Sequence, residues 1–154
     1  RKTGGSSLVV CSAGEARQAK TFWSRLTHSP FLPLIDLPIR VLAARLSRTK
    51  MFVGNDSGPR HLAAAVGVRT VTLFGPEDPH EWHPYDRTNH PLCYVPDLPC
   101  RTSAGPGLPP RCGLEACQVE SHRCMEEISA ESVWAKMEAL LAAPTPFSTE
   151  AGVR

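Results

Sequence analysis

The sequence predicts an α/β fold in which a parallel sheet is flanked by helices. Short apolar runs at residues 7–11, 51–54 and 70–74 are bounded by turn residues and predict buried strands. Segments with apolar side chains on one side follow these runs and predict helices. Strands that alternate with helices at this spacing are typical of parallel sheets, so the amino-terminal half of the chain favours this class.

Four helices complete the pattern. We expect them at residues 15–26, 38–46, about 60–66 and 129–142, with a brief extended piece at residues 34–37. Pro38 suits the first turn of the second helix, since a first turn leaves N–H groups unbonded. Gly67 ends the third helix, and Ser129 caps the fourth. The inward face of that last helix is formed by Val133, Met137, Leu140 and Leu141.

Length and composition divide the chain into a folded part and a tail. The 154 residues suit one domain, which we expect at residues 1–143, with a disordered tail at residues 144–154. Nine of the 15 prolines fall between residues 76 and 110, and five of the six cysteines fall between residues 93 and 124. We therefore expect a Cys- and Pro-rich insertion at residues 91–124.

Charge and hydropathy exclude two classes of protein. Seventeen Lys and Arg against 15 Asp and Glu give a net charge of +2, which lacks the basic excess of a nucleic-acid binder. No apolar run approaches the roughly 18 residues that a membrane-spanning helix needs. The chain begins at Arg1 without a methionine, and we expect it to be a fragment whose targeting signal or preceding domain lies elsewhere.

The loop between residues 54 and 61 has the features of a phosphate site. A strand leads into Asn-Asp-Ser-Gly, and Pro59 then opens a helix whose first N–H groups lie just beyond Ser57 and Gly58. Free N–H groups and the helix dipole bind anions without a cationic side chain. Gly58 lets a phosphate approach the backbone, and His61 is placed to bond or protonate a phosphate oxygen. The alternative is an ordinary helix cap with a solvated histidine.

A second loop strengthens the phosphate interpretation. Gly75-Pro76-Glu77-Asp78-Pro79 directly follows the next predicted strand. In a parallel sheet both loops lie at the carboxyl edge, where open α/β folds bind ligands.

Together these residues resemble glycosyltransferase family 9, the lipopolysaccharide heptosyltransferases. The resemblance rests on Asp56-Ser57-Gly58 with His61 and Ala63-Ala64-Ala65, followed by Leu73-Phe74-Gly75-Pro76 and Asp78-Pro79. It implies a GT-B fold of two Rossmann-like domains, of which this chain is most of the carboxyl-terminal one that holds the nucleotide-sugar donor.

The resemblance assigns roles to particular residues. It implies that Asp56, Ser57, Gly58 and His61 line the donor diphosphate, that Glu15 and Leu37 contact the ribose and the base, and that Gly75, Pro76, Asp78 and Trp82 lie near the sugar. From the residues alone, Glu15 is equally a first-turn acid that the helix dipole favours, and Leu37 a core residue. Trp82 either stacks on the sugar or covers the loop.

The chemistry that the resemblance implies is an inverting transfer of a heptose from ADP-heptose to a lipopolysaccharide core acceptor, without a cofactor. Its general base is an aspartate of the missing amino-terminal domain, so no catalytic residue is expected here and the isolated fragment is expected to be inactive. The same resemblance implies a cytoplasmic protein at the inner membrane face whose lipid-linked acceptor binds through the missing domain. Asp56 suits a turn-holding role, because a carboxylate repels a diphosphate.

The sequence departs from the family at two places. Glu77 stands where the family usually has threonine, and the threonine and lysine that contact phosphate precede the start of this chain. Two other functions stay open: a GT-B transferase that uses another nucleotide sugar such as a UDP-sugar, and a non-catalytic Cys-rich metal-binding module.

The cysteines allow several interpretations. Cys100, Cys112, Cys117 and Cys124 are weak candidate metal ligands, with His122 as a candidate nitrogen ligand or a surface residue. The Cys-x2-Cys spacing typical of zinc sites does not occur among them. Disulfides and free or buried thiols are the alternatives.

Overall fold

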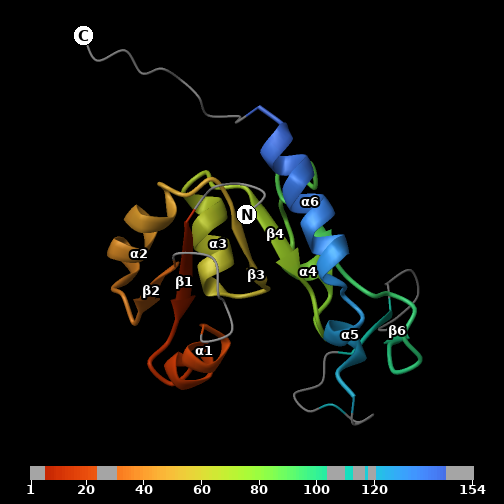
Figure 1. Cartoon of the computed structure of the whole chain (residues 1–154). Coiled ribbons are helices and arrows are strands. Elements are labelled where there is room, and N and C mark those ends of the chain that lie inside the picture. Colours follow the sequence, from red (N-terminus) through yellow and green to blue (C-terminus); the bar gives the residue numbers. More distant parts are fainter. Residues whose placement is uncertain (1–5, 24–30, 104–109, 113–116, 118–120, 145–154) are drawn as a thin grey trace. The chain divides into compact units, whose positions relative to one another are not determined.

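Both parts of the chain contain the parallel pairing that the sequence predicts. A computed structural model describes residues 6–23, 31–103, 110–112, 117 and 121–144 (Figure 1). The chain forms two compact units, residues 1–45 and 46–154, which are described separately below.

The first unit is a strand–helix–strand–helix arrangement. Strand β1 (Ser7–Cys11) pairs in parallel with β2 (Phe31–Ile35), from Ser7 opposite Phe31 to Cys11 opposite Ile35. Helix α1 (Ala16–Trp23) follows the first strand, and α2 (Ile39–Leu46) follows the second. Residues 24–26, expected to end the first helix, lie outside the described residues. Strand β2 begins earlier than the expected 34–37, because pairing with β1 extends it.

The second unit contains a parallel sheet with the order β3-β4-β5. Strands β3 (Phe52–Asn55) and β4 (Thr70–Leu73) lie where the sequence predicts them. The third strand, β5 (Leu92–Cys93), falls within the expected insertion 91–124 but pairs in parallel with Thr72 and Leu73. A strand of two residues is too short to show periodicity, so the sequence does not reveal it.

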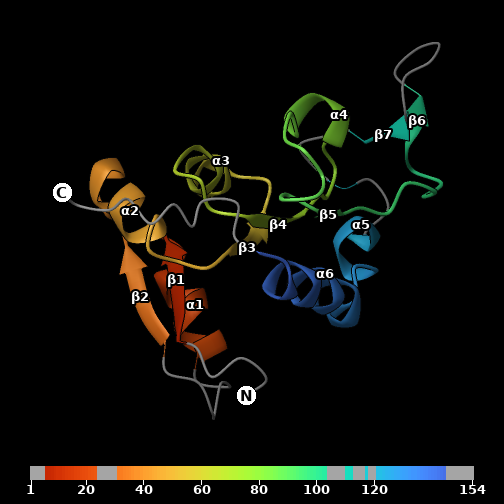
Figure 2. The ribbon, with the colours of Figure 1, turned by 90° about the horizontal axis from the view of Figure 1, so that it is seen from above.

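Helices pack on both sides of this sheet (Figure 2). Helix α3 (Gly58–Ala65) lies on one side, and Ala63 is its fully buried alanine. Helix α6 (Ala130–Ala142) lies on the other, where Leu140 packs with Val71 and Cys93. Val133 and Met137 pack against this cluster, which confirms the predicted inward face of the last helix for Val133, Met137 and Leu140 but leaves Leu141 outside the cluster.

Shorter elements that the sequence does not predict complete the second unit. They are helices α4 (Pro79–Trp82) and α5 (Arg123–Glu126), and an antiparallel pair of β6 (Thr102–Ser103) and β7 (Pro110–Arg111). The expected tail lies outside the described residues except for Pro144. No helix in the described ranges has the length and apolar character needed to cross a membrane.

Candidate functional site

A pocket lies where β3 and β4 end. The two strands run in parallel, so the loops that follow them meet at one edge of the sheet, as the sequence predicts. The pocket has a volume of about 270 Å³. It is lined by Asn55, Asp56, Leu73, Gly75, Pro76, Glu77 and Met125. Both predicted ligand loops therefore contribute to one concave surface.

The first loop exposes backbone N–H groups at the start of α3. The Ser57 side chain does not cap the helix; its Oγ donates to the Asn55 carbonyl at 3.1 Å. The N–H groups of Arg60 and His61 donate to the Ser57 carbonyl, and Pro59 has none. Contacts among the described residues leave the Ser57 and Gly58 N–H groups without a protein partner. A Cβ at Gly58 would meet nothing within 4 Å, so the space beside this backbone is open.

Arg60 links this loop to the segment after the second loop. Its side chain is fully buried, and its Nη2 donates to the Asp56 carboxylate and, at 2.9 Å, to the Trp82 carbonyl. The guanidinium also lies over the Phe74 and Tyr85 rings, 5.7 and 5.2 Å from their centroids. The sequence motif does not single out Arg60, although its i, i+4 spacing from Asp56 is a known signal of ion pairs.

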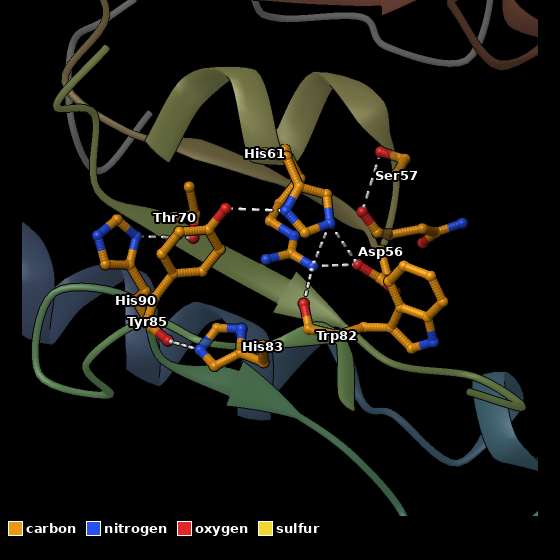
Figure 3. A network of polar contacts seen from close by, with 10 residues as sticks. Asp56, Ser57, His61, Thr70, Trp82, His83, Tyr85 and His90 are labelled. Atoms are coloured by element: carbon orange, nitrogen blue, oxygen red, sulfur yellow. Dashed lines mark hydrogen bonds and ion pairs between the residues drawn. The ribbon is translucent and has the colours of Figure 1, made fainter. Parts of the chain in front are cut away.

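Both ring nitrogens of His61 have protein partners (Figure 3). Nε2 lies 3.0 Å from Arg60 Nη2, and a guanidinium can only donate, so Nε2 accepts. Nδ1 then carries the proton and donates to the Tyr85 hydroxyl at 2.8 Å. Burial and the Arg60 charge lower the pKa of His61, while Asp56 acts in the opposite direction. His61 is therefore neutral at pH 7, and a phosphate oxygen would have to compete with the Tyr85 hydroxyl for the Nδ1 proton.

The second loop is held from behind. The Arg101 guanidinium donates from Nη2 to the Gly75 carbonyl at 2.8 Å and from Nε to the Val95 carbonyl at 2.8 Å. A Cβ at Gly75 would lie 2.9 Å from the Met125 sulfur, so Met125 packs directly on the glycine. Asp78 is buried and caps α4 by accepting from the His80 N–H at 2.8 Å. Gly75 and Pro76 thus line the pocket, whereas Asp78 supports the loop behind it.

Two histidines that follow α4 make hydrogen bonds within the second unit, and of these His83 is buried and His90 half-buried. Trp82 itself has a side chain that is 50% exposed, which disfavours a role as a core cover. His83 is buried and donates from Nε2 to the His90 carbonyl at 2.7 Å, and His90 Nδ1 lies 3.1 Å from the Thr70 hydroxyl (Figure 3). Burial lowers the pKa of both histidines.

In the first unit, the structure places Glu15 and Leu37 beyond the carboxyl ends of β1 and β2. The Glu15 carboxylate accepts from the Ser12 N–H at 2.8 Å and from the Ser12 hydroxyl at 2.7 Å, which closes the turn that precedes α1. These hydrogen bonds lower the pKa of Glu15. Asp36, at a φ of 45°, accepts from the Ala13 N–H at 3.0 Å and joins the two loops of this unit. Leu37 is half-buried.

The cysteines of the second unit gather behind the second loop. Burial raises the pKa of the Cys124 thiol, and the charges that Cys100, Cys112 and Cys117 would carry raise it further. All six cysteines are free, and Cys93 belongs to the core. Among the described residues, no group of three or more His, Cys, Asp or Glu is arranged to hold a metal ion. The described geometry gives the metal-binding alternative no support.

A helix N-terminus and a pocket lie at the carboxyl edge of parallel strands, which is where α/β proteins of this class bind small ligands. The sequence model of glycosyltransferase family 9 (heptosyltransferase) matches residues 7–104, and the chain belongs to this family. The family resemblance expected from the two loops is thereby confirmed.

Two relatives of this chain are heptosyltransferases by name. Lipooligosaccharide heptosyltransferase 2 of Campylobacter jejuni is 32% identical over 67% of this chain and 29% of its own length. Lipopolysaccharide heptosyltransferase 1 of Pseudomonas aeruginosa is 30% identical over 86% of this chain and 38% of its own length. The chain thus spans about a third of the relatives that it matches.

The fold is also similar to a solved structure. A glycosyl transferase family 9 protein from Veillonella parvula superposes with a TM-score of 0.68 at 18% identity, over 92% of this chain and 38% of that one. This similarity confirms the predicted α/β class and agrees with the Rossmann-like half of a GT-B fold.

Proposed function

We propose that this chain binds the nucleotide-sugar donor of a heptosyl transfer, with ADP-heptose as the donor and a lipopolysaccharide core saccharide as the acceptor. The observation that carries the proposal is the open backbone at Ser57 and Gly58, beside the pocket where β3 and β4 end. Membership of family 9 supports the reaction class, and the named activities of the relatives support the sugar.

The diphosphate is proposed to lie at the start of α3. The N–H groups of Ser57 and Gly58 and the positive end of the helix would bond the phosphate oxygens. As the glycosidic bond to the donor breaks, negative charge builds on the departing diphosphate, and these fixed donors stabilise it without a metal ion. The proposal therefore requires no cofactor.

The sugar is proposed to occupy the pocket beside the second loop. Gly75 and Pro76 form its wall, and Glu77 adds a carboxylate that can accept from sugar hydroxyls. Trp82 follows the second loop a few residues further along the chain, and its half-exposed side chain offers an aromatic face for a sugar ring. Glu15 and Leu37 stay predictions for the ribose and the base.

Two further parts of the proposal concern the rest of the enzyme. The general base and the acceptor site are assigned to a domain outside this chain, which spans about a third of its relatives. The enzyme is proposed to act in the cytoplasm, at the membrane face where its lipid-linked acceptor lies.

Calorimetric titration of the 154-residue chain with ADP, UDP and GDP tests the proposal. We expect ADP to bind with the highest affinity and AMP more weakly, because AMP lacks the second phosphate. Preference for UDP would replace ADP-heptose by a UDP-sugar as the donor. Indifference to all three nucleotides at millimolar concentration would overturn the assignment of a donor site.

A further inference from the structure

The burial of Arg60 is costly for the fold. The side chain is fully buried, and its Nε and Nη1 have no hydrogen-bond partner among the described residues. A buried guanidinium loses the free energy of its hydration, and an ion pair with incomplete hydrogen bonding does not fully compensate for this loss. Apolar residues often replace such pairs without loss of stability. Stability alone therefore does not account for an arginine at this position.

The contacts of Arg60 point to the pocket. Asp56 lines the pocket wall, and its carboxylate, with only 14% of the side chain exposed, pairs with Arg60. An unpaired carboxylate there would repel an anionic ligand, because like charges at short range in a partly buried site are only weakly screened. The ion pair offsets the charge of Asp56 on the first-loop side of the pocket, while Glu77 keeps its own charge on the second-loop side.

The same nitrogen of Arg60 also fixes both sides of the site. Nη2 lies 3.0 Å from His61 Nε2 and 2.9 Å from the Trp82 carbonyl. One side chain thus holds the start of α3 and the end of α4 in a single hydrogen-bond network.

We propose that Arg60 is the positioning residue of the donor site: it neutralises Asp56 and ties the first loop to Trp82, so that the pocket accepts a diphosphate. This inference rests on the proposed function. Arg60 contacts no ligand in this role; it acts through Asp56, His61 and the Trp82 carbonyl. The role predicts a dependence on ligand charge that a purely structural residue would not show.

The experiment is a titration of five forms of the chain with adenosine, AMP and ADP. The forms are wild type, Arg60→Met, Asp56→Asn, the double variant Arg60→Met/Asp56→Asn, and Arg69→Met. Arg69 is the matched control, because it is also a buried arginine but precedes β4, at the opposite edge of the sheet, and donates to the Ala143 carbonyl.

We expect Arg60→Met to weaken ADP binding about tenfold or more, AMP binding less, and adenosine binding by about twofold at most, because the exposed Asp56 charge acts on phosphate. Adding Asp56→Asn removes that charge, so it is expected to restore most of the ADP affinity. The double variant is expected to unfold at or above the wild-type temperature. Arg69→Met is expected to leave all three affinities within about twofold of wild type, since screening over the sheet length is strong.

The outcomes separate the two proposals. Wild type that binds no nucleotide overturns the proposed function and the inference with it. The inference alone is overturned if wild type binds ADP but Arg60→Met loses equal affinity for ADP and for adenosine. It is also overturned if the double variant does not recover ADP affinity. Should Arg60→Met not fold, Arg60→Gln replaces it: glutamine keeps an N–H donor for the Trp82 carbonyl but lacks the charge, and the same dependence on ligand charge is expected.

Discussion

The two loops at the carboxyl edge of the sheet are built in opposite ways. In the first, the N–H groups of Ser57 and Gly58 have no partner among the residues that the structure describes, and the space beside the backbone is open. The second is packed from behind, with Met125 against Gly75 and the Arg101 guanidinium on the Gly75 carbonyl. Unbonded N–H groups are uncommon in folded proteins and suit a ligand, whereas a packed loop suits a fixed wall.

Because the two loops are packed differently, the same substitution should have different effects on stability and on binding in each loop. A side chain added to the first loop extends into open space, so it should disturb binding and spare the fold. A side chain added to the second loop meets protein atoms, so it should disturb the fold first. Two glycines, Gly58 and Gly75, allow the comparison to be made with the same replacement.

The largest effect on stability is expected from Gly75→Val. Its Cβ would lie 2.9 Å from the Met125 sulfur and 3.3 Å from Met125 Cγ, and the branched side chain adds further overlap. We expect a loss of about 1 kcal/mol in the free energy of unfolding, measured by urea denaturation, because the flexible end of Met125 can move aside and relieve part of the overlap. Gly75→Val combined with Met125→Ala should recover part of this loss, because the smaller residue makes room. Equal stability of Gly75→Val and wild type would mean that the second loop is not packed as described.

Gly58→Val tests the first loop. We expect the free energy of unfolding to stay within about 1 kcal/mol of wild type, since a Cβ there meets nothing. The ADP affinity is expected to fall about tenfold or more, because the valine side chain occupies the space through which the ligand approaches the backbone. Gly58→Ala is the matched control and should lose less. Unchanged ADP affinity in Gly58→Val would remove the diphosphate from this loop.

The sequence predicts the frame of both loops well. Apolar runs bounded by Gly and Pro mark β1, β3 and β4, and parallel pairing then places the loops at one edge. Strand β5 could not be predicted, because two residues become a strand only through their pairing with Thr72 and Leu73. The hydrogen bonds between Ser12 and Glu15 close the turn before α1, and the S-x-x-E spacing in the sequence is a signal of such bonds.

The supporting residues of the site are harder to predict. Arginine is seldom fully buried unless it is paired, so composition gives no reason to place Arg60 inside. Met125 reaches the pocket from a segment about fifty residues further along the chain, and Tyr85 reaches His61 from a separate loop. Such contacts depend on how distant segments pack, which local patterns do not encode. The sequence therefore predicts the loops that offer ligand contacts and misses the residues that hold them.

His61→Ala should have a smaller effect than Gly58→Val. Both nitrogens of His61 are occupied within the protein, so its loss is expected to loosen the network at the start of α3 instead of removing a direct phosphate donor. We expect a decrease in ADP affinity of a few-fold, equivalent to about 1 kcal/mol, by calorimetry. Tyr85→Phe, which removes the hydroxyl that accepts from Nδ1, should give a similar but weaker decrease. A loss larger than that of Gly58→Val would show that His61 contacts the phosphate directly.

The smallest effect is expected from a change of pH, which should lower the free energy of unfolding through two histidines that follow the second loop. Burial lowers the pKa values of His83 and His90, and the Arg60 charge acts in the same direction on both. The unfolded chain then binds protons more readily than the folded one, so stability is full above the unfolded value of about 6.5 and falls as the pH drops below it. We expect a loss of less than about 1 kcal/mol between pH 7.5 and pH 5.5, by urea denaturation at each pH. His83→Gln should reduce this pH dependence, whereas His80→Gln, at an exposed histidine, should keep it. If His83→Gln leaves the pH dependence unchanged, the burial of His83 does not cause it. The contrast between an open first loop and a closed second loop would then rest on Gly58 and Gly75 alone.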